Sequence, residues 1–171
     1  MEFFEVVHAR HSVRAYTDMP VEGEKLGRIL DAANHAPSAG NLQGYEIYLV
    51  TQTEHRAALV RAALDQEFIA QAPLALVFCA HTARSAVWYE QRGIQLYCIQ
   101  DATIACAYAQ LAATALDLAS VWVGAFDEEA VRQIIGAPEG HRPIIILPIG
   151  YPAKEPRLRP RRELSDLVHE V

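Results

Sequence analysis

The chain has 171 residues, of which 51% are hydrophobic and 21% charged, and its formal net charge is −6 at pH 7. This length suits one domain with one core, so we expect residues 1–171 to form a single domain. The composition excludes a disordered or collagen-like chain, and the acidic balance disfavours nucleic acid as a partner. Residues 1–12 lack the pattern of a signal peptide and no apolar run is long enough to span a membrane. We therefore expect a cytoplasmic protein without a membrane partner.

Helical and strand patterns alternate along the chain. Apolar periodicity predicts helices over 2–9, between Pro20 and Pro37, and over 53–66, 95–118 and 127–136, with Thr53 and Asp127 as N-caps. Runs rich in β-branched and aromatic residues predict strands over 45–51, 72–80, 119–126 and 141–152. This order indicates a sheet sandwiched between helices.

The helix predicted over 95–118 is rich in alanine and apolar on nearly every side. A helix without a polar face has to be covered all round, so it is either the central helix of the core or part of a large subunit interface. Cys79, Cys98 and Cys106 lie in apolar runs and are expected to be buried thiols.

Two arginine-rich segments lie far apart in the sequence. The first is Arg10-His11-Ser12-Val13-Arg14, and the second is a proline-rich tail with Arg157, Arg159, Arg161 and Arg162. Arginine forks together with a hydroxyl suit a phosphate or another planar, acceptor-rich group. The alternatives are a solvated surface turn for the first segment, and a solubilising tail or an RNA-binding arm for the second.

Two segments could let backbone approach a flat ligand, the first through small and amide residues and the second through a glycine. One is the stretch 37–43, PSAGNLQ, and the other is 122–126, WVGAF, where Gly124 follows a predicted strand. The alternatives are a plain connecting turn and a glycine that only eases packing. The histidines are dispersed without metal-ligand spacing, and no GxSxG or GxGxxG motif is present. We therefore expect no metal site, no serine nucleophile and no Rossmann-type nucleotide site.

Four segments together resemble the FMN-dependent nitroreductase family, in the family's order and spacing and over nearly the full length. They are ARHSVRAY, APSAGNLQ, QDATIACAYAQLAATALDLASVWVGAF and EEAVRQIIGAPEGHRPIIILPIGYPAKEPRLRPRREL. The resemblance is to the short members of the family. It implies an α+β, nitroreductase-like fold with a central mixed β-sheet flanked by helices. It also implies an intertwined homodimer with tightly bound FMN at the subunit interface.

The resemblance further implies which residues contact FMN. The segment 10–14 is similar to the motif that holds the phosphate and the pyrimidine end, and the tail is similar to a second phosphate clamp, with Arg162 as an alternative to its neighbours. The loop 37–43 is similar to the stretch that reaches the flavin of the other subunit, and the backbone at Gly124 to the donor near flavin N5. The implied cofactor-binding residues are Arg10, His11, Ser12, Arg14, Pro37, Ser38, Ala39, Asn41, Gln43, Gln66, Val123, Gly124, Arg159 and Arg161. Gly44 follows the loop where relatives often carry proline, which implies a more flexible loop.

The implied activity is a ping-pong transfer of hydride from NAD(P)H through flavin N5 to a nitroaromatic, a quinone or a similar flat acceptor, without a catalytic side chain. Arg14 is expected to stabilise the negative charge of the reduced flavin. The alternatives are a non-catalytic flavin-binding or sensing protein, a specialised relative of the dehalogenase or flavin-fragmenting type, and an interaction protein that uses its basic tail. Trp88, Tyr89 and Arg92 either stack on and steer the acceptor or form a packed helix edge.

Overall fold

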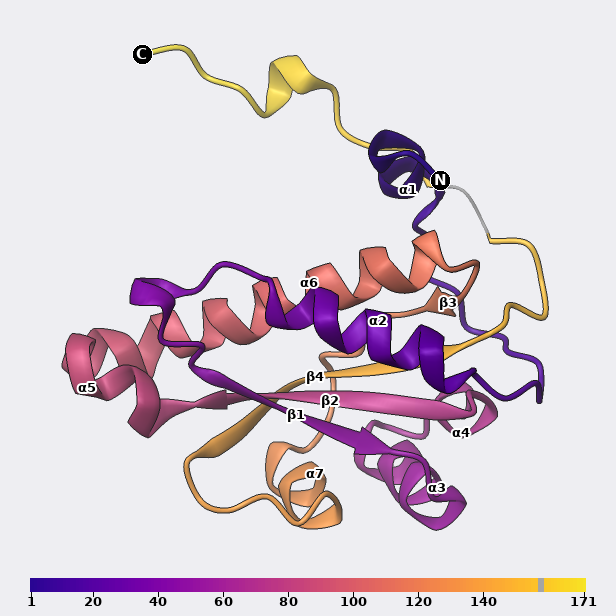
Figure 1. Ribbon diagram of the computed structural model, residues 1–171, viewed down its shortest axis with the longest axis horizontal. Coiled ribbons are helices and arrows are strands. Elements are labelled where there is room, and N and C mark those ends of the chain that lie inside the picture. Colours follow the sequence, from indigo (N-terminus) through magenta and orange to yellow (C-terminus); the bar gives the residue numbers. More distant parts are fainter. Residues whose placement is uncertain (157–158) are drawn as a thin grey trace.

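A four-stranded sheet lies at the centre of the computed structural model, which describes residues 1–156 and 159–171 (Figure 1). The strands are β1 (Tyr45–Val50), β2 (Leu74–His81), β3 (Ala119–Ser120) and β4 (His141–Gly150), in the order β1-β2-β4-β3. The three ladders are antiparallel, and an isolated bridge between Ser12 and Ser120 adds a parallel pairing at the β3 edge.

Helices cover both faces of the sheet. They are α1 (Phe3–Ala9), α2 (Gly23–Asn34), α3 (Thr53–Ala62), α4 (Phe68–Gln71), α5 (Thr82–Arg92), α6 (Cys98–Ala115) and α7 (Glu128–Ile134). Helices α2 and α6 pack on one face, where Ile29 and Ala102 meet Phe78 in the first core. Helices α3, α4 and α7 pack on the other face, where Leu59, Ile69 and Val131 form a second core with Val77. Short turns over Ala39–Asn41, Gly93–Tyr97 and Leu164–Asp166 complete the elements.

Burial of β2 on both faces explains why its sequence is apolar without a break. Successive side chains of a strand point to opposite faces, so Leu76 and Phe78 enter the first core while Val77 and Cys79 enter the second. All four of these side chains are fully buried. The predicted sheet between two helical layers is therefore confirmed.

Two local predictions need correction. The strand expected over 119–126 is reduced to Ala119–Ser120, after which the chain turns and Val123 exchanges two 3.0 Å hydrogen bonds with Ile146. Trp122 and Gly124 face outward there, which breaks the continuous apolar pattern into an irregular edge. Residue Thr53 begins α3 rather than capping it.

The N-cap of α3 is instead Gln52, without a capping side-chain bond, whereas Asp127 caps α7 as predicted by accepting a 2.9 Å bond from the Ala130 N–H. The predicted helix over 95–118 begins with the π-turn Gly93–Tyr97 and then forms α6. Helix α4 has only four residues and was not predicted.

Helix α6 is buried on one side only. Ala102, Cys106 and Ala109 lie in the first core, whereas Tyr108 is 41% exposed on the opposite side. A groove of about 400 Å³ runs along that side, lined by Phe3, Val6, Ala32, Tyr108, Leu111, Ala112 and Ala115. The complete burial expected of this helix is therefore not reached within one chain. None of the helices in the described residues is long and apolar enough to cross a membrane.

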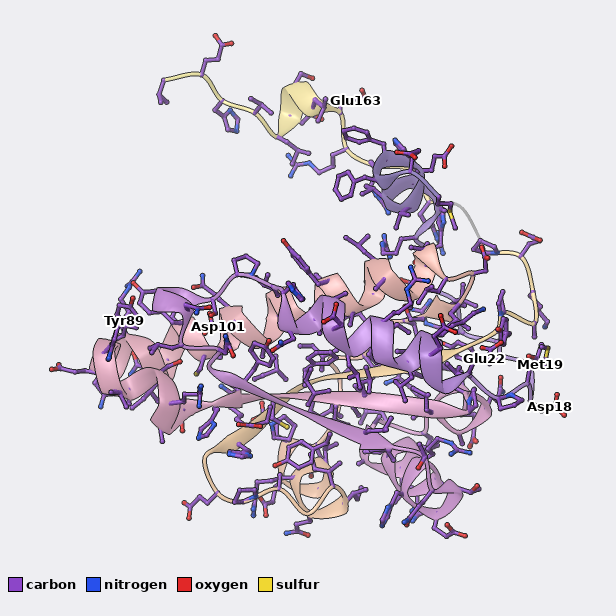
Figure 2. The ribbon with its side chains drawn as sticks, in the orientation of Figure 1. Asp18, Met19, Glu22, Tyr89, Asp101 and Glu163 are labelled. Carbon is purple, nitrogen blue, oxygen red and sulfur yellow. The ribbon has the colours of Figure 1, made fainter. Side chains whose placement is uncertain are left out.

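Helix α1 and the tail 159–171 stand away from the sheet (Figure 1). Figure 2 shows Glu163 on this tail, remote from Asp101 and Tyr89 at the other end of the molecule. Apolar side chains of both segments are exposed, among them Phe4 at 75% and Leu164 at 74%. This part of the chain therefore presents apolar surface that the sheet does not cover.

Candidate functional site

The two arginine-rich segments meet at one cavity of about 160 Å³. Its lining consists of Arg10, His11, Ser12, Arg14, Arg159 and Arg161. The first segment is fixed in place because Ser12 bridges to Ser120 and the Val13 N–H donates to the Ser120 carbonyl at 3.1 Å. Within this lining, His11 Nδ1 donates to the Ala9 carbonyl at 2.8 Å, which orients the ring.

The tail supplies its two arginines to the cavity and turns a third away. Arg162 donates to the Asp166 carbonyl at 2.6 Å and does not line the cavity, so Arg159 and Arg161 are the pair that does. Arg157, which the sequence pattern also singled out, lies outside the described residues.

Among the described residues, the cations of this cavity have no acidic partner. In the part of the chain that the structure describes, no carboxylate lies within 4.0 Å of the guanidinium of Arg10, Arg14, Arg159 or Arg161, although the chain has an excess of acidic residues. Elsewhere Arg132 and Arg142 are each paired with a glutamate, at 2.6 and 2.7 Å. Four arginines that share a cavity without counter-charge make a site for a strongly acidic ligand such as a phosphate group.

A strip of backbone and amide groups continues from this cavity. The Arg14 guanidinium lies 5.9 Å from the centre of the Phe68 ring, and Gln66, two residues earlier, donates to the carbonyls of Ala63 and Ala125 at 2.9 and 3.3 Å. Gln66 is thereby held against the segment that contains Val123 and Gly124.

The two predicted backbone donors of that segment differ. The Val123 N–H is used by its bond to Ile146, whereas the exposed Gly124 N–H has no backbone acceptor among residues 1–156 and 159–171. Gly124 is therefore the residue with an N–H available to a ligand.

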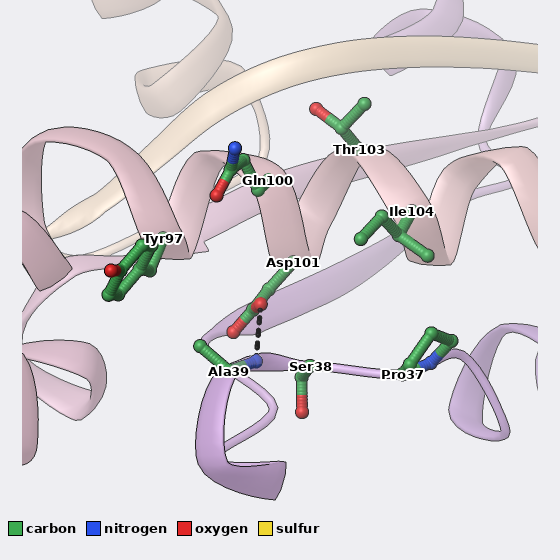
Figure 3. A pocket seen from close by; sticks show the side chains of 8 residues that line it. All are labelled: Pro37, Ser38, Ala39, Tyr97, Gln100, Asp101, Thr103 and Ile104. Atoms are coloured by element: carbon green, nitrogen blue, oxygen red, sulfur yellow. Dashed lines mark hydrogen bonds between the residues drawn. The ribbon is translucent and has the colours of Figure 1, made fainter. Parts of the chain in front are cut away.

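The loop 37–44 is tied to α6 by one buried carboxylate (Figure 3). Asp101, only 2% exposed, accepts the Ala39 N–H on Oδ1 at 3.0 Å and the Gly44 N–H on Oδ2 at 3.1 Å. Ser38 Oγ accepts the Gln43 N–H at 3.0 Å inside the loop. Gly40, Asn41 and Gln43 have φ values of 55°, 56° and 52°. Glycine adopts this conformation freely, whereas Asn41 and above all Gln43 adopt it at a cost that the ties of the loop offset.

Gly44 serves close packing rather than freedom of the loop. A Cβ at this position would lie 2.2 Å from Ser85 Oγ, and the Gly44 carbonyl accepts the His81 N–H at 2.9 Å. The expectation of a more flexible loop is therefore wrong at this residue. Sequence reasoning also missed Asp101, whose only signal is one acidic residue in the first turn of an otherwise apolar helix.

A cavity of about 450 Å³ opens beside the loop (Figure 3). It is lined by Pro37, Ser38, Ala39, Tyr97, Gln100, Asp101, Thr103 and Ile104. The edge of α5 packs against this region: the Tyr89 ring lies 4.9 Å from the Tyr97 ring, and Arg92 Nε donates to Tyr97 Oη at 2.8 Å. The packed-edge interpretation fits Tyr89 and Arg92, while Trp88 is 65% exposed.

The loop and residues 10–14, which supply part of the arginine cavity, lie at opposite ends of α6 (Figure 1). Asp101 holds the loop at the first turn of this helix, whereas Ser120, which pairs with Ser12, follows the last turn. The helix separates these points by about 20 Å. One chain therefore does not bring all of the predicted site residues together.

Residues 7–151 match the family model described as the Nitroreductase family. The chain belongs to the nitroreductase family, and the predicted family and fold are confirmed. It is 31% identical to an FMN reductase [NAD(P)H] of Bacillus subtilis, over 93% of this chain and 69% of the relative. It is also 31% identical to the oxygen-insensitive NADPH nitroreductase of Salmonella typhimurium, over 97% and 72%.

Comparison with a solved structure also supports the nitroreductase fold. The NADPH:FMN oxidoreductase of Vibrio harveyi complexed with NAD⁺ superimposes with a TM-score of 0.90, at 28% identity, over 98% of this chain and 76% of that one.

Proposed function

We propose that the protein is an FMN-dependent NAD(P)H oxidoreductase that reduces a nitroaromatic, a quinone or a similar flat acceptor. The observation that carries this proposal is the cavity where Arg10, Arg14, Arg159 and Arg161 meet Ser12 without counter-charge. Membership of the nitroreductase family supports FMN as the ligand whose phosphate would bind there, and the names of the relatives support NADH or NADPH as donor.

Each part of the site has a distinct task in this proposal. The arginines and Ser12 bind the phosphate, with His11 beside them, and Arg14 adds positive charge on the side of Phe68. Gln66 and the backbone at Val123 and Gly124 border the flavin ring. FMN, when bound, would supply the redox chemistry between NAD(P)H and the acceptor. The protein therefore needs only to bind and orient the flavin and its substrates and to exclude water, and it needs no side chain that acts as an acid or a base.

The proposal also requires a homodimer with two equivalent FMN sites at its subunit interface. The loop residues Pro37, Ser38, Ala39, Asn41 and Gln43 lie about 20 Å along α6 from the arginine cavity of their own chain. A second copy packed on the exposed apolar side of α6 supplies the missing loop and covers Tyr108. The exposed apolar groups of α1 and the tail then gain a partner surface.

The visible spectrum of the purified protein, before and after anaerobic addition of NADH or NADPH, tests the activity. We expect flavin absorption that either nucleotide bleaches and that a quinone or a nitroaromatic then restores. Flavin that neither nucleotide bleaches would favour a binding or sensing protein. A protein that stays colourless in excess FMN would overturn the proposal.

Mixed dimers test the shared site. One subunit carries Arg10→Ala and Arg159→Ala, and the other carries Asn41→Ala and Gln43→Ala. In a mixed dimer one site receives both defects and the other receives none. We therefore expect half of the sites to bind FMN as tightly as the unmodified protein, although each variant alone binds weakly. Mixed dimers without any tight site would show that the loop serves its own chain.

A further inference from the structure

Three side chains with metal-binding groups converge at one end of the sheet, although no spacing in the sequence joins them. Glu46 lies in β1, His81 ends β2 and His141 begins β4. One ligand atom from each lies within 4.8 Å of the other two. The expectation that this chain has no metal site rested on sequence spacing, which does not reveal ligands on three neighbouring strands.

Strand register produces this cluster. His81 and His141 are directly paired in the β2–β4 ladder, and their rings lie 4.4 Å apart. Glu46 pairs with Cys79, so its side chain lies diagonally beside His81 on the same face of the sheet. This is the face of Tyr48, which packs against the second core with α3 and α7. The cluster is therefore on the opposite side of the sheet from α6 and Asp101.

Two close contacts hold the side chains of the cluster where they can ligate one ion. Glu46 Oε1 lies 2.9 Å from His81 Nδ1, so these two atoms are near enough to bind the same ion, and Tyr48 Oη lies 2.7 Å from His141 Nδ1. Within the described residues, Nε2 of His141 has no hydrogen-bond partner and is free to ligate. Metal-binding imidazoles are commonly oriented by such a bond through one nitrogen while the other nitrogen is free.

We propose that Glu46, His81 and His141 bind one divalent transition-metal ion of the Zn²⁺ type, with water in the remaining position and Tyr48 orienting His141. Two imidazoles and a carboxylate are a ligand set that Zn²⁺ accepts, at about 2.0–2.2 Å from each ligand atom. The ligand atoms then have to approach to about 3.4 Å of one another. Half-exposed side chains at strand ends allow this contraction, and those of His81 and Glu46 are 25% and 41% exposed.

Such an ion would join three strands at the end of the sheet where the loop and α5 are attached. Glu46 follows Gly44 by two residues, and His81 directly precedes α5. We therefore expect the ion to stabilise the fold there without taking part in flavin chemistry.

Calorimetric titration of Zn²⁺ into the metal-free, flavin-containing protein tests this site, with the Co²⁺ absorption between about 500 and 650 nm as a second signal for four ligands that include nitrogen. We expect one saturable site per chain and a rise in the melting temperature. His81→Gln and His141→Gln are expected to lower the Zn²⁺ affinity at least 100-fold, and Tyr48→Phe about 10–100-fold. Retained flavin absorption verifies that each variant folds.

His35→Gln is the matched control, because His35 also lies beside a carboxylate, with Nδ1 3.5 Å from Asp31, but lacks a third ligand. It should leave the Zn²⁺ affinity unchanged. Absence of saturable binding to the unmodified protein would overturn the proposal. So would binding that survives both His81→Gln and His141→Gln, since that would place the ion on other surface groups.

Discussion

The arginine cavity and the Asp101-tied loop form opposite kinds of binding region. The cavity joins residues from distant parts of the sequence, and its cations have no acidic partner in the described chain. The loop is one continuous stretch, and a buried carboxylate already accepts two of its backbone N–H groups, those of Ala39 and Gly44. Ligand binding therefore supplies the charge that the cavity lacks, whereas the loop has its shape before any ligand arrives. The cavity should determine affinity for the phosphate, and the loop the shape of the site.

Removal of the tail should have the largest effect. Deletion of residues 159–171 takes two of the four cavity arginines away, so we expect FMN to be lost on purification while the far-ultraviolet spectrum of the sheet and helices remains. The matched control is deletion of 163–171, which removes the apolar end of the tail but keeps Arg159 and Arg161. Stoichiometric FMN in the longer deletion would place the phosphate elsewhere.

A single cavity arginine should have a smaller and more selective effect. Arg10→Ala removes a charge-assisted hydrogen bond worth about 1.5–3 kcal/mol, so the Kd for FMN should rise about 10–150-fold. Riboflavin lacks the phosphate, and its Kd should not change. Arg28→Ala, an exposed arginine of α2, is the control for net charge. An equal loss of affinity for both flavins would contradict the assignment of the cavity to the phosphate.

Loss of the carboxylate that ties the loop should, in contrast to loss of a cavity arginine, affect stability and weaken the binding of both flavins alike. Asp101→Asn replaces one carboxylate oxygen by an amide nitrogen and leaves Ala39 or Gly44 without an acceptor, so the free energy of unfolding should fall by about 1–3 kcal/mol. The affinities for FMN and for riboflavin should then fall by the same factor. Urea denaturation and flavin titration measure the two effects. Asp31→Asn, on the exposed side of α2, is the control.

Helix α6 separates the two regions, and the titration of its buried thiol should have the smallest effect on stability. Complete burial raises the pKa of the Cys106 thiol well above its usual range. The unfolded thiol ionises above pH ~8.5 while the folded thiol stays neutral, so this group lowers the free energy of unfolding as the pH rises past that value. Alkylation at pH 8 should modify Cys106 only after unfolding, as peptide mass analysis can establish. Rapid labelling of the native protein would indicate that α6 opens.

Much of the fold follows from local sequence patterns. The apolar run of β2 and the Asp127 cap were predicted from residue types, because strand alternation and capping are local effects. The prediction of a strand over 119–126 failed because Trp122 and Val123 match a strand by composition but lie at an irregular edge, where only Val123 forms a bridge. The Thr53 cap failed because the α3 boundary differs by one residue.

Less of the candidate site could be predicted from local sequence patterns. The family resemblance predicted the pairing of residues 10–14 with Arg159 and Arg161, since spacing alone does not bring distant segments together. No sequence motif reveals the role of Asp101, because its carboxylate accepts hydrogen bonds from two backbone N–H groups, which nearly any residue could provide. The cluster of Glu46, His81 and His141 depends on strand register, which becomes known only with the ladder.

The arginine cavity also separates folding from cofactor capture along the chain. The sheet uses residues up to Gly150, whereas the cavity also needs Arg159 and Arg161. A chain truncated between these points keeps every strand and helix that packs on the sheet but lacks half of the cavity arginines. Such a chain would fold without acquiring the flavin.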